Sequence, residues 1–245
     1  MNIDFKNKVI LISGGTSGIG LAISKRLFDL GGAVYRTSTT KNKLIKGKNK
    51  QNFIETLQVD FSKNLSIKSF FKNIKNIKKV DILINNAGVN KVNSINLINE
   101  NDWDKIYKIN LKTPFLLTKD ISKKMMLNKY GRILNISSIF GVIAKEGRAS
   151  YSASKSGLVG LTKATALDLA PHNILVNSIS PGFVLTDLTK KILTSSEINK
   201  LKKQVPLNRF ADVEEIVSSI LFLIHENNTY ITGQNIIVDG GFTSK

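Results

Sequence analysis

Cysteine is absent from the sequence, so disulfide bonds and thiolate metal sites are both excluded. Histidine is scarce as well: His172 and His225 are the two in the chain, so we expect no histidine-rich metal site. No apolar run approaches the roughly 18 residues that span a bilayer. The amino-terminal residues show no signal-peptide pattern before an apolar segment begins. We therefore expect a soluble, cytoplasmic protein that holds no metal.

Acidic residues are few beside the basic ones: 18 against 36, which gives a net charge of +18. An excess of basic residues of this size can bind nucleic acid or another acidic partner. Only five basic residues are arginine, however, and the lysines are spread along the whole chain. Aromatic residues, which a nucleic-acid face would interleave with the cations, make up only 7%. We therefore favour a general compositional bias and expect neither a nucleic-acid nor a membrane partner.

Apolar runs alternate with amphipathic segments along the chain. The run at 9–12 is apolar throughout, which is typical of a strand buried on both faces. From Gly18 the apolar residues recur every three or four positions, as in a helix, and Gly31-Gly32 ends it. Further strands are predicted at 33–37, 54–59, 80–84, 132–136, 174–179 and 235–238, and helices at 66–77, 102–128, 152–170 and 213–225. This alternation predicts an α/β, doubly wound Rossmann fold over residues 1–245, a parallel seven-stranded sheet with helices on both faces.

A glycine-rich loop, Ser13-Gly14-Gly15-Thr16-Ser17-Gly18-Ile19-Gly20, joins the first predicted strand to the first predicted helix. Glycines let the backbone approach a pyrophosphate, and a helix N-terminus supplies N–H donors and a positive dipole end. A tight turn between a strand and a helix also needs glycine for structural reasons alone. The position of this loop one strand into a βαβ pattern favours dinucleotide binding.

Three side chains suggest acid–base chemistry on a carbonyl group. Tyr151 and Lys155 are four residues apart, so a helix places them on one face. An ammonium beside a phenol stabilises the phenolate and lowers its pKa from about 10, which suits a general acid. Ser138 follows the strand predicted at 132–136, at the edge where doubly wound sheets bind ligands, and can donate a hydrogen bond to a carbonyl oxygen. Each feature alone is also common in ordinary helices and strand ends.

Taken together, the motifs resemble those of the short-chain dehydrogenases/reductases from end to end. They occur in the family's order: the glycine loop, Asp60, Asn85-Asn86-Ala87-Gly88, Asn110, Ser138, Tyr151-x-x-x-Lys155 and Pro181-Gly182. The resemblance implies a catalytic set of Asn110, Ser138, Tyr151 and Lys155. Ser138 would polarise the carbonyl, and Tyr151 would give its proton to the developing alkoxide. Lys155 would hold the nicotinamide ribose and lower the Tyr151 pKa, and Asn110 would anchor a water of a proton relay.

The resemblance also implies a nicotinamide dinucleotide cofactor. Asp60 would contact the adenine, and residues 86–88 would line the adenosine ribose. Pro181, Gly182 and the residues after them would hold the carboxamide side of the nicotinamide. The implied cofactor-binding residues are Gly14, Thr16, Ser17, Gly18, Ile19, Gly20, Thr39, Asp60, Phe61, Asn86, Ala87, Gly88, Tyr151, Lys155, Pro181, Gly182, Val184 and Thr186.

The end of the second predicted strand bears on the choice of nicotinamide. NAD-specific relatives place an acid there to bind the ribose 2′-hydroxyl. Residues 33–41 contain no Asp or Glu, and hydroxyls with Lys41 or Lys43 could instead receive a 2′-phosphate. Many NADP-dependent relatives have Arg or Lys before Gly-Ile-Gly, where this chain has Ser17. NADP(H) is favoured over NAD(H).

Within the family, the chain most resembles the 3-oxoacyl-(acyl-carrier-protein) reductases of fatty acid synthesis, which implies reduction of a carbonyl to an alcohol. In those enzymes arginines beside the active-site mouth receive the carrier's acidic helix, and the matching positions here are Lys129 and His172. Residues 89–94 depart from the usual reductase sequence. Sugar, polyol and small secondary-alcohol dehydrogenases share every catalytic motif and remain an alternative. A non-enzymatic dinucleotide-binding regulator, which needs only the glycine loop, is the alternative from another class.

Two further expectations concern assembly and motion. The segment 213–225 carries more apolar surface than one sheet face needs, and six of its apolar residues suggest an interface: Val213, Ile216, Val217, Ile220, Leu221 and Ile224. Relatives use this helix and the last strand between subunits, so we expect a homotetramer. Residues 183–212 follow the strand that faces the nicotinamide and have little strand character, so we expect a substrate lid. Within it, 185–201 is expected to be mobile without ligand and ordered with cofactor and substrate.

Overall fold

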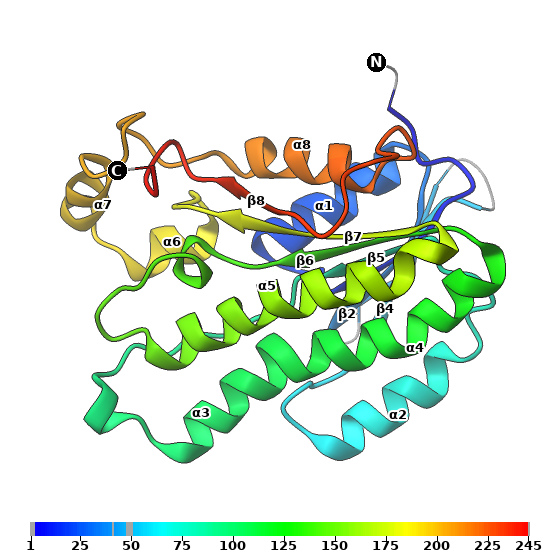
Figure 1. The fold of residues 1–245 in the computed structure, drawn as a ribbon, viewed down its shortest axis with the longest axis horizontal. Helices are drawn as coiled ribbons and strands as arrows, with labels where there is room; N and C mark the ends of the chain where they lie inside the picture. Colours follow the sequence, from blue (N-terminus) through cyan, green and yellow to red (C-terminus); the bar gives the residue numbers. More distant parts are fainter. Residues whose placement is uncertain (1–2, 41, 48–50, 245) are drawn as a thin grey trace.

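Seven parallel strands form the central sheet of the computed structural model, which describes residues 3–40, 42–47 and 51–244 (Figure 1). They are β1 (Val9–Ser13), β2 (Ala33–Ser38), β4 (Phe53–Gln58), β5 (Ile82–Asn85), β6 (Gly131–Ile136), β7 (Ile174–Pro181) and β8 (Asn235–Val238). A two-residue antiparallel strand, β3 (Ile45–Lys46), extends one edge and gives the order β3-β4-β2-β1-β5-β6-β7-β8. The doubly wound fold and its parallel strands are confirmed, and β3 was missed because two residues carry no periodicity.

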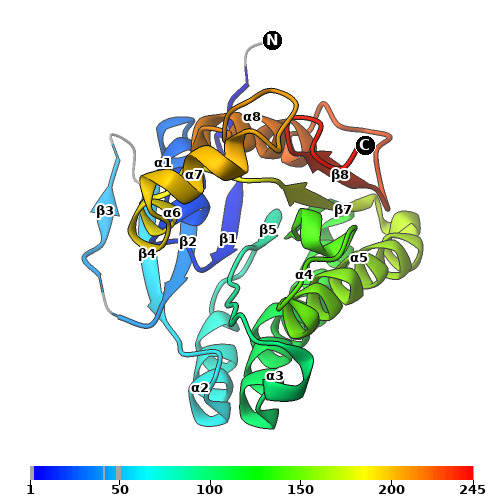
Figure 2. The ribbon, with the colours of Figure 1, turned by 90° about the vertical axis from the view of Figure 1, so that its left-hand side faces the viewer.

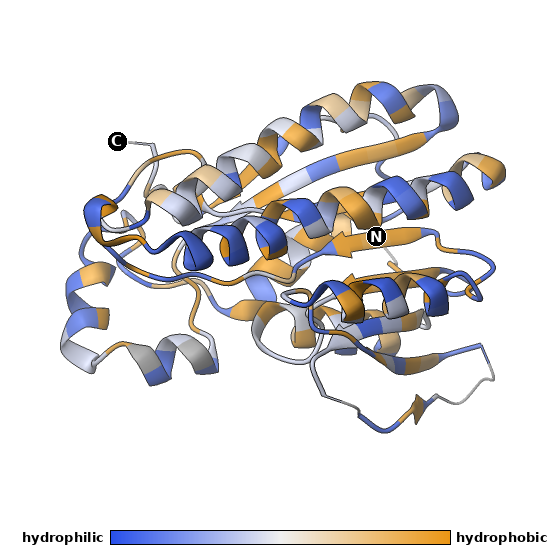
Figure 3. Cartoon of the chain, turned by 90° about the horizontal axis from the view of Figure 1, so that it is seen from below, coloured by the Kyte–Doolittle hydropathy of each residue, from blue (hydrophilic) through white to orange (hydrophobic). Residues whose placement is uncertain are grey.

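Helices cover both faces of the sheet. Figure 2 shows α1 (Gly18–Asp29) and α8 (Val213–Ile224) above it, with α2 (Asn64–Ile74), α3 (Glu100–Tyr107), α4 (Thr113–Asn128) and α5 (Ala149–Leu169) below it. Ile10 and Ile12 of β1 pack with α1 and α8, whereas Leu11 packs with the helices of the other face. This explains why strands are apolar along most of their length while helices are apolar on one side (Figure 3). Within the described chain, no helix is long and apolar enough to cross a membrane.

The single helix predicted at 102–128 is divided in the structure. A π-helical turn, η2 (Lys108–Lys112), separates α3 from α4, and Asn110 lies within it. Single π-helical turns inside helices are frequent at functional sites. The hydrophobic pattern could not show this turn, because one extra residue in one turn barely alters a 3.6-residue period.

The sheet reverses its winding direction between β1 and β5. The chain runs outward from β1 through β2 and β4, then returns to place β5 on the other side of β1. In doubly wound sheets, ligands bind at such a switch point, outside the carboxyl ends of the strands. Figure 1 shows α6 (Asp187–Ile192) and α7 (Ser195–Lys202) at this end of the sheet. The remaining short helices are η1 (Ile95–Leu97), η3 (Ile139–Gly141) and η4 (Ala170–His172).

Backbone hydrogen bonds hold together the two ends of the predicted lid. The Leu185 N–H donates to the Ala211 carbonyl and the Ala211 N–H donates to the Phe183 carbonyl, each at 2.9 Å. Between these ends, α7 has no buried residue and is held by a capping box of Thr194 and Glu197. An exposed helix between two fixed ends of the lid suits a segment that moves as a unit. The mobility of this segment stays a prediction.

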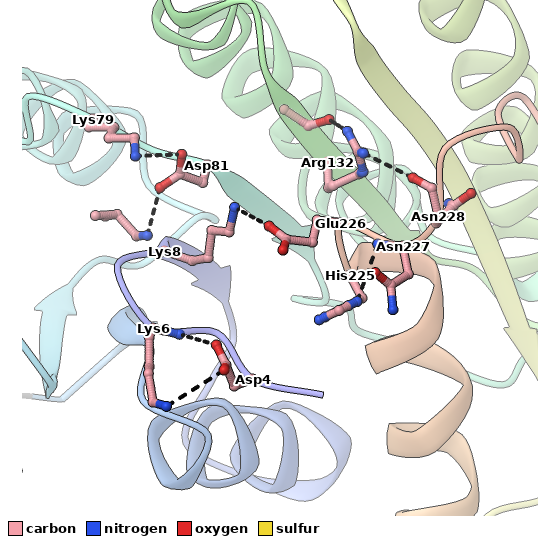
Figure 4. A network of polar contacts seen from close by, with 12 residues as sticks. Asp4, Lys6, Lys8, Lys79, Asp81, Arg132, His225, Glu226, Asn227 and Asn228 are labelled. Carbon is pink, nitrogen blue, oxygen red and sulfur yellow. Dashed lines mark hydrogen bonds and ion pairs between the residues drawn. The ribbon is translucent and has the colours of Figure 1, made fainter. Parts of the chain in front are cut away.

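At the amino ends of the strands, charged side chains join distant segments (Figure 4). Lys8 pairs with Glu226 at 2.8 Å, and the buried Asp81 carboxylate accepts the Val9 N–H at 2.9 Å. The buried Arg132 donates to the Asn228 carbonyl at 2.9 Å. These contacts connect β1, β5 and β6 to the loop after α8, at the edge opposite the switch point.

Candidate active site

The glycine-rich loop has the shape that its composition predicts. Gly14 and Gly18 adopt positive φ angles of 68° and 50°, which L-residues rarely adopt. A Cβ atom on Gly20 would lie 2.1 Å from the Gly14 carbonyl oxygen. Ser17 is the N-cap of α1 but makes no side-chain capping bond, so the first N–H groups of the helix remain available to an anion.

The segment after β5 is fastened to this loop. The Asn86 side chain donates to the Gly14 carbonyl at 2.7 Å, and the Ser13 hydroxyl accepts the N–H groups of Asn86 and Ala87, each at 3.0 Å. Gly88 then leads toward α5: a Cβ there would lie 3.5 Å from Asn110 Oδ1 and from Lys155 Nζ. The predicted adenosine and nicotinamide positions are thus continuous along the carboxyl edge of the sheet.

The end of β2 lies against the other side of the glycine loop. Thr37 Oγ1 accepts the Gly14 N–H at 2.9 Å, and Thr16 Oγ1 lies 3.3 Å from Ser38 Oγ. Thr39 is exposed. Of the two lysines expected to help here, Lys43 is exposed and Lys41 lies outside the described residues.

Arg36 belongs to this region and was missed from the sequence. Its guanidinium is buried below the loop, with Nη1 3.4 Å from the Gly15 carbonyl and Nε 3.1 Å from Thr56 Oγ1. Burial lowers its pKa, but an arginine remains a cation at neutral pH. The one sequence signal was a charged residue inside a predicted strand.

Asp60 and Phe61 differ in what they can offer a ligand. Asp60 Oδ1 accepts the Ser62 hydroxyl at 2.6 Å and the Ser62 N–H at 2.9 Å, and these bonds lower the pKa of its carboxyl. The Phe61 ring is buried against Phe70, with 5.7 Å between ring centroids. Phe61 therefore contributes its backbone alone to this edge, whereas the Asp60 carboxylate is partly exposed and ionised.

All four predicted catalytic residues meet at the carboxyl ends of β5 and β6. Ser138 follows β6, Tyr151 and Lys155 share one face of α5, and Asn110 comes from the π-helical turn. Lys155 is buried and donates to the Ile136 carbonyl at 2.7 Å, with its Nζ 5.7 Å from the centre of the Tyr151 ring. Because these residues come from separate segments, the parallel sheet is what brings them together.

The Asn110 side chain makes three hydrogen bonds within the protein. Its Oδ1 accepts the Val89 N–H at 2.8 Å, and its Nδ2 donates to the Val89 carbonyl at 2.9 Å and to Ser154 Oγ at 3.1 Å. Ser154, missed from the sequence, in turn donates to the Tyr151 carbonyl at 2.7 Å. Asn110 therefore fixes α5 relative to the loop after β5, a positioning contact that the sequence did not reveal.

Two perturbed pKa values coincide at this site. Burial raises the pKa of the Tyr151 phenol, although hydrogen bonding with Ser138 and the charge of Arg148 act in the opposite direction. Burial lowers the pKa of Lys155 to about 8. The cost of burying a phenolate therefore outweighs the two opposing contacts, and the expected effect of Lys155 on the Tyr151 pKa stays a prediction. Such a concentration of shifted groups in one crevice is typical of an active site.

The start of the predicted lid faces the glycine loop. Pro181 ends β7, Val184 is buried, and Thr186 caps α6 by accepting the Thr189 N–H at 3.1 Å. A Cβ on Gly18 would lie 3.8 Å from the Thr186 methyl group. The residues expected to hold the nicotinamide thus lie across the crevice from the loop expected to hold the pyrophosphate.

Lys129 and His172 lie away from this site. Lys129 precedes β6 and His172 precedes β7, and the Asn173 side chain joins their loops by donating to the Lys129 carbonyl at 3.1 Å. Ser138 follows the other end of β6, about 20 Å away at 3.3 Å per residue. The expectation that this pair lies beside the mouth of its own active site is wrong, because both residues precede their strands.

Comparison with known proteins decides the family. The family model described as Enoyl-(Acyl carrier protein) reductase matches residues 14–243. The 3-oxoacyl-(acyl-carrier-protein) reductase FabG of Aquifex aeolicus (strain VF5) is 38% identical, with 98% of this chain and 99% of that protein covered. The chain belongs to the short-chain dehydrogenases/reductases. The reductase of the same name from Salmonella typhimurium (strain LT2) is 34% identical, with 98% of each chain covered.

Solved structures of other short-chain dehydrogenases/reductases match over nearly the whole chain. A 4-hydroxyisoleucine dehydrogenase complexed with NADH is 35% identical with a TM-score of 0.90, covering 98% of this chain and all of that one. A Beutenbergia cavernae protein assigned as an NAD(P)-dependent gluconate 5-dehydrogenase, with NADP bound at low occupancy, is 25% identical with a TM-score of 0.89 and covers 99% of each chain. Both proteins were solved with a nicotinamide dinucleotide.

Proposed function

We propose that the protein is an NADP(H)-preferring oxidoreductase that reduces the 3-oxo group of an acyl thioester held by an acyl carrier protein. The observation that carries this proposal is the convergence of Ser138, Tyr151 and Lys155 at the carboxyl edge of the sheet, beside a glycine loop shaped for a pyrophosphate. The full-length relatives named as 3-oxoacyl-(acyl-carrier-protein) reductases support the substrate class.

The chain's own residues divide the work on the carbonyl group. The bound dinucleotide supplies the hydride. The Ser138 hydroxyl donates a hydrogen bond to the carbonyl oxygen, and the Tyr151 phenol transfers its proton to that oxygen as negative charge develops there. The Lys155 ammonium holds the nicotinamide ribose and stabilises the phenolate that Tyr151 becomes. Asn110 positions α5 and, in this proposal, anchors the water through which the proton is replaced.

Reduction of a panel of substrates by NADPH tests this function. We expect acetoacetyl-pantetheine to be reduced much faster than crotonyl-pantetheine, which belongs in the panel because the family description names an enoyl reductase. The structural match to 4-hydroxyisoleucine dehydrogenase favours a second candidate, oxidation of a small hydroxy acid, so hydroxy acids with NADP⁺ form the second arm. If only the hydroxy acids are turned over, the substrate is a hydroxy acid and not a 3-oxoacyl thioester. No turnover with any compound would favour a dinucleotide-binding regulator.

The preference for NADP(H) predicts the effect of Ser38→Asp. The Ser38 hydroxyl lies 3.3 Å from Thr16 Oγ1, at the end of a strand where no carboxylate opposes a 2′-phosphate and Arg36 adds a cation. A carboxylate at position 38 should repel that phosphate and accept a ribose 2′-hydroxyl. We expect kcat/KM for NADPH to fall about 100-fold and that for NADH to rise. The neutral Ser38→Asn should change the ratio little, and an unchanged ratio in Ser38→Asp would contradict the preference.

A homotetramer remains part of the proposal, but the residues that support an interface differ from those expected. Of the six apolar residues of α8 that suggested an interface, five are buried within the chain. The exposed apolar side chains there are Phe222, 45% exposed, and Ile237 of β8, 39% exposed. We expect light scattering at micromolar concentration to give a tetramer that Phe222→Glu weakens. A wild-type monomer would refute the assembly.

A further inference from the structure

Arg148 is a half-buried cation without a hydrogen-bonding partner in the part of the chain that the structure describes. The guanidinium groups of Arg36, Arg132 and Arg209 all donate to oxygens, and Arg26 is exposed on the end of α1. The Arg148 side chain is partly buried, yet it makes no hydrogen bond or ion pair with any described residue. A guanidinium carries five donors, and partly buried donors are normally satisfied.

The surroundings of Arg148 place its charge beside the reacting groups. Its Cζ lies 5.6 Å from the centre of the Phe140 ring, and the Phe140 N–H donates to Ser138 Oγ at 3.2 Å. Its charge also acts on Tyr151, three residues further along the chain. Arg148 therefore lies close enough to Tyr151 for its charge to act on the phenol, and it contacts the ring of the residue whose N–H holds Ser138.

The backbone around Arg148 is fixed. The Arg148 carbonyl accepts the Ser152 N–H at 2.7 Å at the start of α5, and the Arg148 N–H donates to the Lys145 carbonyl at 3.2 Å. Gly147 has φ 71°, and its carbonyl accepts the Asn93 N–H at 3.0 Å. The cation is therefore presented from a rigid element rather than from a free loop.

Phe140 also belongs to an aromatic cluster. Its ring meets Phe183 edge-on with 6.4 Å between centroids, and Phe183 stacks on Phe210 at 5.2 Å and meets Phe242 at 5.2 Å. A substrate at Ser138 thus lies near both an aromatic cluster and an unpaired guanidinium. This combination suits a substrate with one polar end and one apolar end.

We propose that Arg148 binds a second substrate oxygen two carbons from the reacting carbonyl: the thioester carbonyl of a 3-oxoacyl thioester or the carboxylate of a free 3-oxo acid. This inference rests on the proposed function and adds a residue that sets its specificity. In a 1,3-dicarbonyl the two oxygens are close enough that one can lie between Ser138 and Tyr151 while the other meets the neighbouring guanidinium. The N–H donors of the Arg148 guanidinium can hydrogen-bond this second oxygen. A simple ketone has no second oxygen for Arg148 to bind.

The test compares wild type with Arg148→Met on acetoacetyl-pantetheine, acetoacetate and 2-pentanone, each at the pH optimum of the variant. Loss of the cation raises the Tyr151 pKa for every substrate, so activity must be compared at each optimum. We expect kcat/KM to fall about 30-fold for the thioester and about 100-fold for acetoacetate, and less than threefold for 2-pentanone. Arg148→Lys, which keeps the charge but loses the fork, should recover part of the acetoacetate activity.

The outcomes separate this inference from the proposed function. Equal losses on all three substrates, or no loss on any, would overturn the role of Arg148 while leaving the reductase intact. A wild type that reduces 2-pentanone but neither dicarbonyl would overturn both. Calorimetry of acetoacetate binding to the NADP⁺ complex gives a measurement independent of turnover. Its Kd should rise about 30-fold in Arg148→Met, and an unchanged Kd would overturn the inference even if turnover is slow.

Discussion

Tyr151→Phe is expected to lower kcat by about 10³-fold while the protein still binds NADPH. The substitution removes the proton donor but keeps the ring that lies 5.7 Å from Lys155 Nζ, so α5 and the cofactor crevice should be unchanged. Among the described neighbours of the phenol, Ser138 is a far weaker acid and Lys155 is directed at the Ile136 carbonyl, so neither should replace it. Stopped-flow reduction of acetoacetyl-pantetheine measures the rate, and quenching of protein fluorescence by NADPH measures binding.

Ser138→Ala is the matched comparison, because it removes a hydrogen-bond donor and leaves the acid in place. Its cost should be roughly 3 kcal/mol, about 100-fold in kcat, which is smaller than the loss from Tyr151→Phe. If Tyr151→Phe kept more than a few per cent of the wild-type rate, the proton would have to come from another group. Equal NADPH affinity in wild type and both variants would show that the substitutions slow the reduction step and do not weaken cofactor binding.

The fold could be predicted because parallel strands buried on both faces are continuous apolar runs. The run at 9–12 and the segment 174–179 correspond directly to β1 and β7. The π-helical turn at 108–112 and the antiparallel β3 could not be predicted in the same way. Both are accompanied by contacts with other segments, such as the bond of Asn110 with Val89 and the pairing of Ile45 with Ile54, which a local period does not reveal.

The candidate catalytic residues could be named from the sequence because each stands in a motif with fixed spacing. The residues around them could not be named in this way. Arg36, Arg148 and Ser154 belong to no motif, and each matters only through a contact with a segment that is distant or on another turn. For Lys129 and His172 the resemblance suggested a docking site beside the active-site mouth, but their position before β6 and β7 places them at the far edge of the sheet. That they receive a carrier stays a prediction.

Lys155→Met is expected to abolish efficient turnover and weaken dinucleotide binding, yet to stabilise the protein without ligand. In the proposed function the activity falls because the same ammonium would hold the nicotinamide ribose and stabilise the phenolate. The stability rises because burial lowers the pKa of Lys155 to about 8 from 10.5, so the charged form favours the unfolded chain. At pH 7 the buried ammonium destabilises the wild type by about 3 kcal/mol, which Lys155→Met removes. The variant also loses the hydrogen bond to the Ile136 carbonyl, which costs it about 1 kcal/mol.

The pH dependence of this effect identifies its cause. The unfolded chain binds the Lys155 proton more tightly than the folded one, so wild-type stability should rise between about pH 8 and pH 10.5. Lys155→Met lacks this titration, so its advantage should be largest below pH 8 and fade as the pH approaches 10.5. At pH 7 the net gain of ~2 kcal/mol corresponds to a Tm higher by roughly 4–8 °C. Thermal unfolding of both proteins at equal concentration across this range measures the difference. A variant that is less stable at pH 7, or a difference that does not change with pH, would mean that the buried ammonium is already compensated by the fold.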